Sequence, residues 1–237
     1  MSGDGAGLPQ RITQSLAPHG LILRGGFHPA TGDGVPPLAD GSPTSTMMLI
    51  GNASTGDGDP MWRAFAAARG RFTGADPLND WTRAVVAPLA TELGAEPLYP
   101  FGGPPHLPFQ RWAQRAEPVA PSPLGLLIHP EYGLWHAYRA ALAFAERLEL
   151  PARGEAVSPC TRCGERPCLS ACPVGAFSGA GFDAQACAAH LDSPEGSDCL
   201  EQGCRARRAC PVAPARAHRP GQAAFHMRAF RRGIALG

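Results

Sequence analysis

The sequence contains no lysine, and all twenty-one of its basic residues are arginine. Without a lysine amine, the chain cannot form a Schiff base with a carbonyl substrate or with pyridoxal phosphate. It also cannot supply the lysine of a nucleotide-binding P-loop. Two large enzyme classes are therefore excluded.

Long apolar runs and targeting signals are missing as well. No stretch approaches the roughly 20 apolar residues that a membrane-spanning helix needs. The start, MSGDGAGLPQRITQ, has neither a cationic region before an apolar run nor paired arginines. We therefore expect a cytoplasmic protein with no membrane partner.

Cysteine is absent from the first 159 residues, and all eight cysteines lie between Cys160 and Cys210. The stretch before them, ELPARGEAVSP, has proline, glycine and charge without periodicity, which is typical of a linker. The sequence thus predicts a cysteine-free domain over 1–155 and a cysteine-rich domain over 156–237. From Gln202 onward there are eight arginines and no Asp or Glu, so the second domain ends in a basic tail.

Apolar patterns in the first domain predict strands alternating with helices. TMMLIGN (46–52) reads as a buried strand, and Asp59 with Pro60 as the start of a helix. LGLLIHP (124–130) reads as a second buried strand. The spacing of apolar residues over 134–148 predicts a further helix. The fold class is therefore expected to be mixed α and β.

The cysteine spacing indicates two tetrathiolate sites. The run from Cys160 to Pro173 reads C-x2-C-x4-C-x3-C-P, two residues longer than the C-x2-C-x2-C-x3-C-P run of bacterial ferredoxins, whose fourth cysteine ligates the other cluster. The sequence ACPV occurs at Ala171 and again 38 residues later at Ala209. Eight thiols and a repeated Cys-Pro predict two 4Fe-4S clusters.

Disulfide bonds and structural zinc ions are the two alternative roles for the cysteines. Disulfides are not favoured in a cytoplasmic chain with closely spaced cysteines. Two structural zinc ions would share the C-x2-C spacing, but zinc does not require a proline after the fourth cysteine. Because a tetrathiolate cluster is anionic, the positive charges of the arginines among the cysteines would offset its negative charge.

The order of these motifs, including DAQAC with Cys187 near a helix capped by Asp183, resembles the dicluster domain of epoxyqueuosine reductase and reductive dehalogenases. That resemblance implies interleaved ligand sets, although the gaps around Cys199 and Cys204 depart from the family pattern. The implied ligands are Cys160, Cys163, Cys168 and Cys210 for one cluster, and Cys172, Cys187, Cys199 and Cys204 for the other.

The stretch LGLLIHPEYGLWHAYRAAL resembles a strand and turn of the cblC-type cobalamin-processing protein. TMMLIGNASTGDGDPMWRAF and ADPLNDW follow the order of the same protein. The resemblance implies a nitroreductase-like α+β domain that binds cobalamin. Its cofactor contacts would be His129, Tyr132, Gly133, Trp135 and Arg139. From the residues alone, a Trp and a Tyr here are as well explained by core packing, and a lone His by a structural role.

Together these patterns predict an iron–sulfur oxidoreductase that passes single electrons to a corrinoid or substrate held by the N-terminal domain. Its donor would be a redox partner of the ferredoxin or flavodoxin type, and no catalytic residue is assigned. The alternative is a non-catalytic dicluster ferredoxin whose N-terminal domain docks a redox partner. A non-redox RNA-binding module is suggested by the basic tail alone, so a nucleic-acid partner is not expected.

Overall fold

The computed structural model describes residues 7–179 and 181–235. It contains both helices and strands, so the predicted mixed α and β class is confirmed. The chain divides into two compact units. The first comprises Met1–Ala53, Asp59–Pro118 and Ala137–Glu155, and the second comprises Ser54–Gly58, Val119–His136 and Ala156–Gly237. The cysteine-rich unit thus includes two segments that the predicted boundary at residue 155 assigned to the other domain.

The first unit is built on a four-stranded sheet with the strand order β1-β2-β6-β3. β1 pairs antiparallel with β2, and β3 pairs antiparallel with β6. Between β2 and β6, the Ser45 N–H donates to the Phe144 carbonyl at one end, while Gly51 lies against Ala137 at the other. These two strands are therefore also antiparallel. The strands are β1 (Ile22–Phe27), β2 (Thr46–Ala53), β3 (Glu96–Leu98) and β6 (His136–Phe144).

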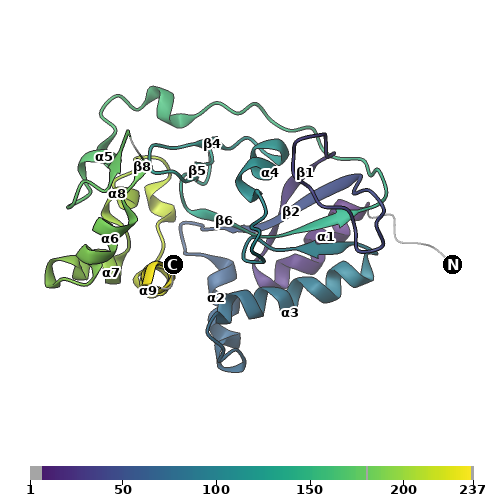
Figure 1. Ribbon diagram of the computed structural model, residues 1–237, viewed down its shortest axis with the longest axis horizontal. Helices are drawn as coiled ribbons and strands as arrows, with labels where there is room; N and C mark the ends of the chain where they lie inside the picture. The colour runs from purple at the N-terminus through teal and green to yellow at the C-terminus, as the bar shows by residue number, and fades with distance from the viewer. Residues whose placement is uncertain (1–6, 180, 236–237) are drawn as a thin grey trace. The chain divides into compact units, whose positions relative to one another are not determined.

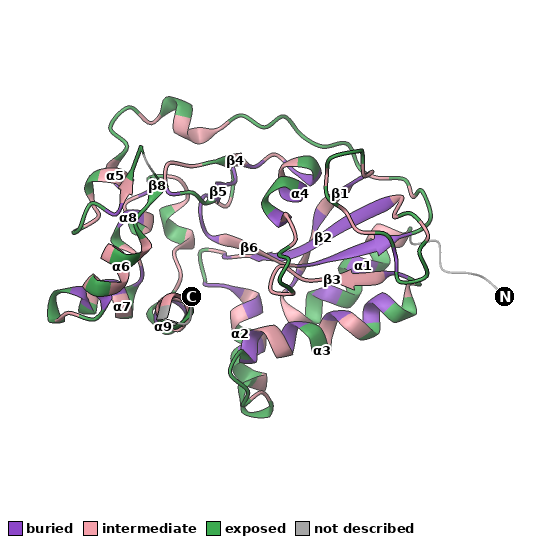
Figure 2. Ribbon diagram, in the orientation of Figure 1, coloured by how far each residue is buried: buried purple, intermediate pink, exposed green. Residues whose placement is uncertain are grey.

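Burial is concentrated in the two central strands (Figure 2). The predicted strand at 46–52 is confirmed as β2, which is buried over 46–52. The helix predicted over 134–148 is wrong, because β6 occupies most of that range. Its consecutive residues 140–144 are all buried, since side chains on both faces of a central strand are covered. Such a run matches a helical apolar pattern as well as it matches a strand.

Helices lie on both sides of this sheet: in Figure 1, α2 and α3 are below it and α4 is above it. The predicted helix start is confirmed, because the Asp59 carboxylate accepts hydrogen bonds from the N–H groups of Met61 and Trp62. The helices of this unit are α1 (Leu8–Leu16), α2 (Pro60–Ala68), α3 (Pro77–Glu92) and α4 (Phe109–Ala116), with 3-10 turns η1 (Ala17–His19) and η2 (Arg69–Arg71).

The second unit consists mainly of short helices and two small hairpins. The hairpins are β4 (Ala120–Pro121) with β5 (Leu127–Ile128), and β7 (Phe177–Ser178) with β8 (Gly181–Phe182). The helices are α5 (Pro167–Ser170), α6 (Ala184–Leu191), α7 (Ser197–Gln202), α8 (Arg205–Arg208) and α9 (Pro220–Ala235). The 3-10 turns are η3 (Pro159–Arg162), η4 (Pro194–Gly196) and η5 (Pro214–Arg216). Within the described part of the chain, no helix combines the length and apolar character needed to cross a bilayer.

Candidate metal centre

The eight cysteine side chains lie in the second unit, and none of them forms a disulfide. Their mutual electrostatic effects divide them into two groups. Burial raises the pKa of Cys168, and three neighbouring thiols raise it further. Burial also raises the pKa of Cys187, to about 11, again with the help of three neighbouring thiols. Set one contains Cys160, Cys163, Cys168 and Cys210, and set two contains Cys172, Cys187, Cys199 and Cys204. These sets have the same members as the ligand groups that the sequence resemblance implies.

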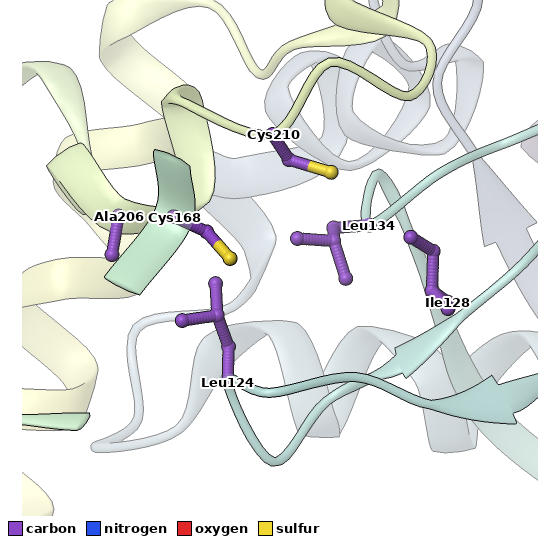
Figure 3. Close-up of a cluster of buried hydrophobic side chains, with 6 residues drawn as sticks. All are labelled: Leu124, Ile128, Leu134, Cys168, Ala206 and Cys210. Atoms are coloured by element: carbon purple, nitrogen blue, oxygen red, sulfur yellow. The ribbon is translucent and has the colours of Figure 1, made fainter. Parts of the chain in front are cut away.

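Set one lies against an apolar wall that comes from segment 119–136. Cys168 and Cys210 are 9% and 7% exposed, and they belong to one buried cluster with Leu124, Ile128 and Leu134. Figure 3 shows the sulfur atoms of Cys168 and Cys210 in the same interior space as the side chains of Leu124 and Leu134. The hairpin β4–β5 and the turn after it therefore shield the thiols of set one.

All four thiols of set two line a single small cavity of about 20 Å³. The apolar side chains of Val174, Phe177 and Met227 form part of its wall. His190 also lines it, and the buried Nε2 atom of this residue has no hydrogen-bond partner among the residues that the structure describes. Leaving a buried polar atom unsatisfied costs about 1–3 kcal/mol, so the cavity is suited to a group that interacts with an imidazole nitrogen.

Local structure explains how set two is positioned. The Asp183 carboxylate accepts a hydrogen bond of 2.9 Å from the Ala186 N–H at the start of α6, so the predicted cap near Cys187 is confirmed. Beyond α6, a Cβ atom on Gly196 would lie 1.8 Å from the His190 carbonyl oxygen. Only glycine allows this approach, which sets the direction of α7 and hence the position of Cys199.

Backbone N–H groups point at two of the sulfur atoms in set two. The Ala176 N–H donates to the sulfur of Cys172 at 3.3 Å. Burial raises the pKa of Cys204, and hydrogen bonds from the backbone N–H groups of Arg207 and Ala206 oppose that shift. Cys204 is the N-cap residue of α8, where unpaired N–H groups are expected. Such hydrogen bonds stabilise thiolates and tune the potential of iron–sulfur clusters.

The donor set fits a four-iron cluster better than it fits a single ion. Among the described residues, no three His, Cys, Asp or Glu side chains form a group that could hold one metal ion. A structural zinc ion needs its thiolate sulfurs about 2.3 Å from one point. A 4Fe-4S cluster instead spreads its four thiolates over four iron atoms. Four thiols arranged around a cavity match the second geometry.

The sequence repeat corresponds to a structural repeat. The 38-residue offset between the two ACPV sequences also separates α5 from α8, and each of these one-turn helices leads into its Ala-Cys-Pro. Cys172 follows three thiols of set one but lies among those of set two. Cys210 follows three thiols of set two but lies among those of set one. Each Cys-Pro thus directs its thiol away from the preceding run.

The predicted corrinoid contacts His129, Tyr132 and Gly133 form a tight turn inside the second unit. The backbones of His129 and Gly133 are paired by two hydrogen bonds of 2.9 Å, and the His129 ring stacks on Tyr132 at 4.2 Å. Gly133 has φ +58°, and a Cβ atom there would lie 2.4 Å from the Val212 carbonyl oxygen. The close approach that glycine permits is therefore to the chain that follows Cys210.

Trp135, another predicted corrinoid contact, is 3% exposed and packs within the second unit. The Arg207 guanidinium lies over its ring at 4.5 Å, and the His218 ring meets it edge-on at 5.4 Å. Arg207 also donates from Nε and Nη2 to the Leu134 carbonyl. These contacts hold α8 against residues 134–135.

Arg139, the fifth predicted contact, belongs to the first unit. It lies on the strand β6, which begins after Trp135, and not on a helix as predicted. Its guanidinium donates to the Thr82 hydroxyl, the Asn79 side chain and the Leu78 carbonyl at 2.9–3.2 Å. Burial lowers the pKa of Arg139 to about 10, while Asp59 opposes the shift. It therefore remains a cation at neutral pH and fixes the first turn of α3. A corrinoid role for these five residues stays a prediction.

No protein-family profile and no curated protein matches the chain. Two solved structures of epoxyqueuosine reductase are similar to it. One is the enzyme from Bacillus subtilis with its catalytic loop swung out of the active site, and it is 18% identical to this chain. The alignment covers 83% of this chain and 58% of the Bacillus subtilis chain, with a TM-score of 0.47. The other, bound to an epoxyqueuosine-modified tRNA-Tyr stem loop, is 17% identical, covers 76% and 54%, and has a TM-score of 0.45. The chain spans little more than half the length of these proteins, and a likeness this distant assigns no activity.

These structures nevertheless correct one sequence-based expectation. A nucleic-acid partner was not expected, whereas one of the two similar structures holds a tRNA stem loop. The expectation was drawn because the basic tail from Gln202 onward was the one feature of the sequence that suggested nucleic-acid binding. It is withdrawn.

Sequence reasoning missed several residues that shape the site. Leu124 and Leu134, which shield set one, carry no cysteine signal, and the apolar runs around them were attributed to the other domain. His190 lies three residues after Cys187 on α6, so its helical spacing from a ligand could have identified it. His218, by contrast, lies far along the chain from Trp135, and no local pattern connects the two.

Proposed function

We propose that the protein is an iron–sulfur oxidoreductase whose second unit binds one 4Fe-4S cluster through set one and another through set two. The cavity of set two is the observation that carries this proposal. Thiols that merely filled a core would pack against neighbouring side chains, because protein interiors leave few voids. The four thiols of set two instead line one cavity and lie close enough together that, beyond the effect of burial, Cys172, Cys199 and Cys204 raise the pKa of Cys187, which is how ligands of a common centre are arranged. When bound, such clusters accept and release single electrons.

Around Cys204, some of the chain's own groups oppose the effect of burial, which raises the pKa of this thiol. Burial lowers the pKa of Arg207 to about 10, and Cys204 opposes that shift. Arg207 is therefore charged at neutral pH and interacts favourably with negative charge on Cys204. The backbone N–H groups at the start of α8 act in the same direction. The apolar wall of Leu124 and Leu134 covers Cys168 and Cys210 of set one.

The electron acceptor is proposed to be a corrinoid or a substrate bound by the nitroreductase-like first unit, with a ferredoxin- or flavodoxin-type donor. This part of the proposal is supported by the sequence resemblance. The second candidate function is a dicluster electron carrier that docks a redox partner. It is favoured by the contacts of Trp135 and Arg139, which are engaged with protein groups inside their own units.

Anaerobic reconstitution with iron and sulfide tests the cluster proposal. We expect about eight iron and eight sulfide per chain, because each set of four thiolates matches one cubane cluster. Two zinc atoms without sulfide would overturn the proposal. The reduced protein should also give electron paramagnetic resonance signals from both clusters.

Titration of the reconstituted protein with cobalamin separates the two candidate functions. If the first unit binds a corrinoid as the resemblance implies, the visible spectrum should shift from the base-on to the base-off form. An unchanged spectrum at saturating cobalamin, with iron content intact, would support the electron carrier instead. The control is the Trp135→Ala variant with its iron intact, which should bind cobalamin more weakly if the predicted contacts hold the corrinoid.

A further inference from the structure

A second cavity in the second unit, of about 40 Å³, lies beside Cys204. Its wall includes the side chains of Trp135, Arg207, Arg208 and His218. No Asp or Glu is among its described lining residues. Cys204 also lines the cavity of set two, so the two cavities are neighbours. No part of the proposed electron transfer uses this second space.

Two of the residues that line this cavity carry a buried ring nitrogen with no hydrogen-bond partner in the described part of the chain: Nε1 of Trp135 and Nε2 of His218. The indole N–H of Trp135 can only donate. Because Trp135 is 3% exposed, bulk water does not satisfy this donor. A buried donor of this kind costs about 1–3 kcal/mol when nothing accepts from it. The site therefore calls for an acceptor.

Arg207 supplies a positive charge at the same place. Its Nε and Nη2 atoms donate to the Leu134 carbonyl, which leaves Nη1 for a further acceptor. Burial lowers the pKa of His218 to about 2, and the positive charge of Arg207 and the neighbouring His226 add to the shift. The His218 ring is therefore neutral at physiological pH, and its Nε2 can carry the proton and donate it in a hydrogen bond.

We propose that this cavity is a binding site for a small monovalent oxyanion, of the class of a short carboxylate. Trp135, His218 and Arg207 would donate to its oxygens, and the cationic Arg207 would balance its charge. Arg208 is already paired with Asp198. Hydrogen bonds to a charged acceptor are stronger than those to a neutral one. A site with three donors, one cation without a carboxylate partner among the described residues and no carboxylate in its described lining favours an anion over a cation or a neutral ligand.

Because the site lies beside Cys204, a bound anion and the cluster proposed for set two would influence each other electrostatically. An electron added at set two increases negative charge next to the anion and so weakens its binding. By linkage, the bound anion makes reduction of that cluster harder by the same free energy. A tenfold loss of affinity on reduction corresponds to a potential lower by 59 mV for a one-electron couple.

Calorimetric titration of the reconstituted full chain with sodium formate tests the site directly. We expect saturable binding of one formate per chain. Trp135→Phe keeps the ring under Arg207 but removes one donor, so affinity should fall about tenfold or more, since a hydrogen bond to a charged group is worth about 1.5–3 kcal/mol. Trp62→Phe makes the same change in the first unit and should bind formate as the wild type does.

His218→Phe provides a second variant, and equal iron and sulfide contents show that each variant is folded and loaded. Absence of saturable binding to the wild type would overturn the proposal and indicate that the cavity holds water only. Binding that both variants retain unchanged would also overturn it, because the anion would then lie elsewhere. Failure of the cluster proposal would be recognised separately, by missing iron and sulfide.

A redox titration with and without formate then tests the linkage. The midpoint potential of one cluster should fall with formate in the wild type and stay constant in Trp135→Phe. A variant whose potential differs from the wild type even without formate would indicate that the indole N–H bonds the cluster itself, which would contradict the anion site.

Discussion

Replacing Gly133 by alanine should weaken the second unit and release the cluster held by set one. Gly133 has φ +58°, where an L-residue costs about 1–2 kcal/mol. The added Cβ would also lie 2.4 Å from the Val212 carbonyl oxygen, and such overpacking costs about 1–3 kcal/mol. The combined loss is about 2–5 kcal/mol. Because Val212 closely follows Cys210, relief of the clash should displace that thiol from set one.

Two other glycines separate the causes of this effect. Gly94 has φ +64° with nothing within 4 Å of a Cβ, so Gly94→Ala should cost only the backbone term of about 1–2 kcal/mol. Gly20 has φ +62° and a Cβ 2.3 Å from the Met61 nitrogen, so Gly20→Ala should be as costly as Gly133→Ala, but in the first unit. The entropy lost by the unfolded chain is the same in all three variants.

Thermal melting and metal analysis of the three variants form the assay. A chain of this size shifts its melting temperature by about 2–4 °C for each kcal/mol. Gly133→Ala should melt lower and lose the signals of one cluster, whereas Gly20→Ala should melt lower with both clusters retained at low temperature. If Gly133→Ala behaved like Gly94→Ala, the close contact with Val212 would be refuted. If it melted lower with both clusters unchanged, the turn would not position Cys210.

Four further outcomes are expected. Cys172→Ser should disturb the cluster of set two and Cys210→Ser that of set one, by electron paramagnetic resonance; the opposite assignment would contradict the exchange of ligands. His190→Phe should keep full iron content but change the midpoint potential of one cluster, and an unaltered potential would count against an imidazole contact. Arg139→Met should destabilise the first unit by roughly 2–4 kcal/mol in denaturant titrations, because it removes charged hydrogen bonds, without loss of iron; wild-type stability would refute its structural role. A fragment of residues 1–155 should bind a hydrophobic dye, since segment 119–136 loses its partners, and a compact, dye-free fragment would show that the segment folds without the cysteines.

The cysteine-rich site was predictable because its information is local. The thiols of Cys160, Cys163 and Cys168 come from one short loop, and the second Cys-Pro repeats the first at a fixed offset. Ligand spacing of this kind is a property of the chain itself. The division into two sets was implied by the family resemblance, and its members are the same as those of the two groups of thiols that raise one another's pKa in the structure. Their role as cluster ligands stays a prediction.

The character of β6 could not be predicted from its pattern. Its residues Ala140–Phe144 are apolar at every position, and small alanine side chains fit a helix as readily as a central strand. What decides the matter is non-local: β6 lies between β2 and β3, and both of its edges are paired. The error also affected the role predicted for Arg139. On a helix, Arg139 would lie on the same face as Trp135. In the structure Arg139 lies on β6, in the first unit, whereas Trp135 belongs to the second.

The predicted boundary at residue 155 differs from the division in the structure because it was drawn from the distribution of cysteines. That distribution shows where the thiols are, but not which residues shield them. Apart from α9, the helices of the second unit are short, and they provide little apolar surface of their own for two sets of thiols. Segment 119–136 supplies that surface through Leu124 and Leu134, and it is tied in place at Gly133 by the Val212 backbone and by the hydrogen bonds from Arg207. Because the segment contains no cysteine and precedes the ligands in the chain, only the long-range contacts reveal it. The turn that resembles a cofactor wall is thus, within its own unit, the support of the second Cys-Pro, and a mutation there should be judged first by its effect on set one.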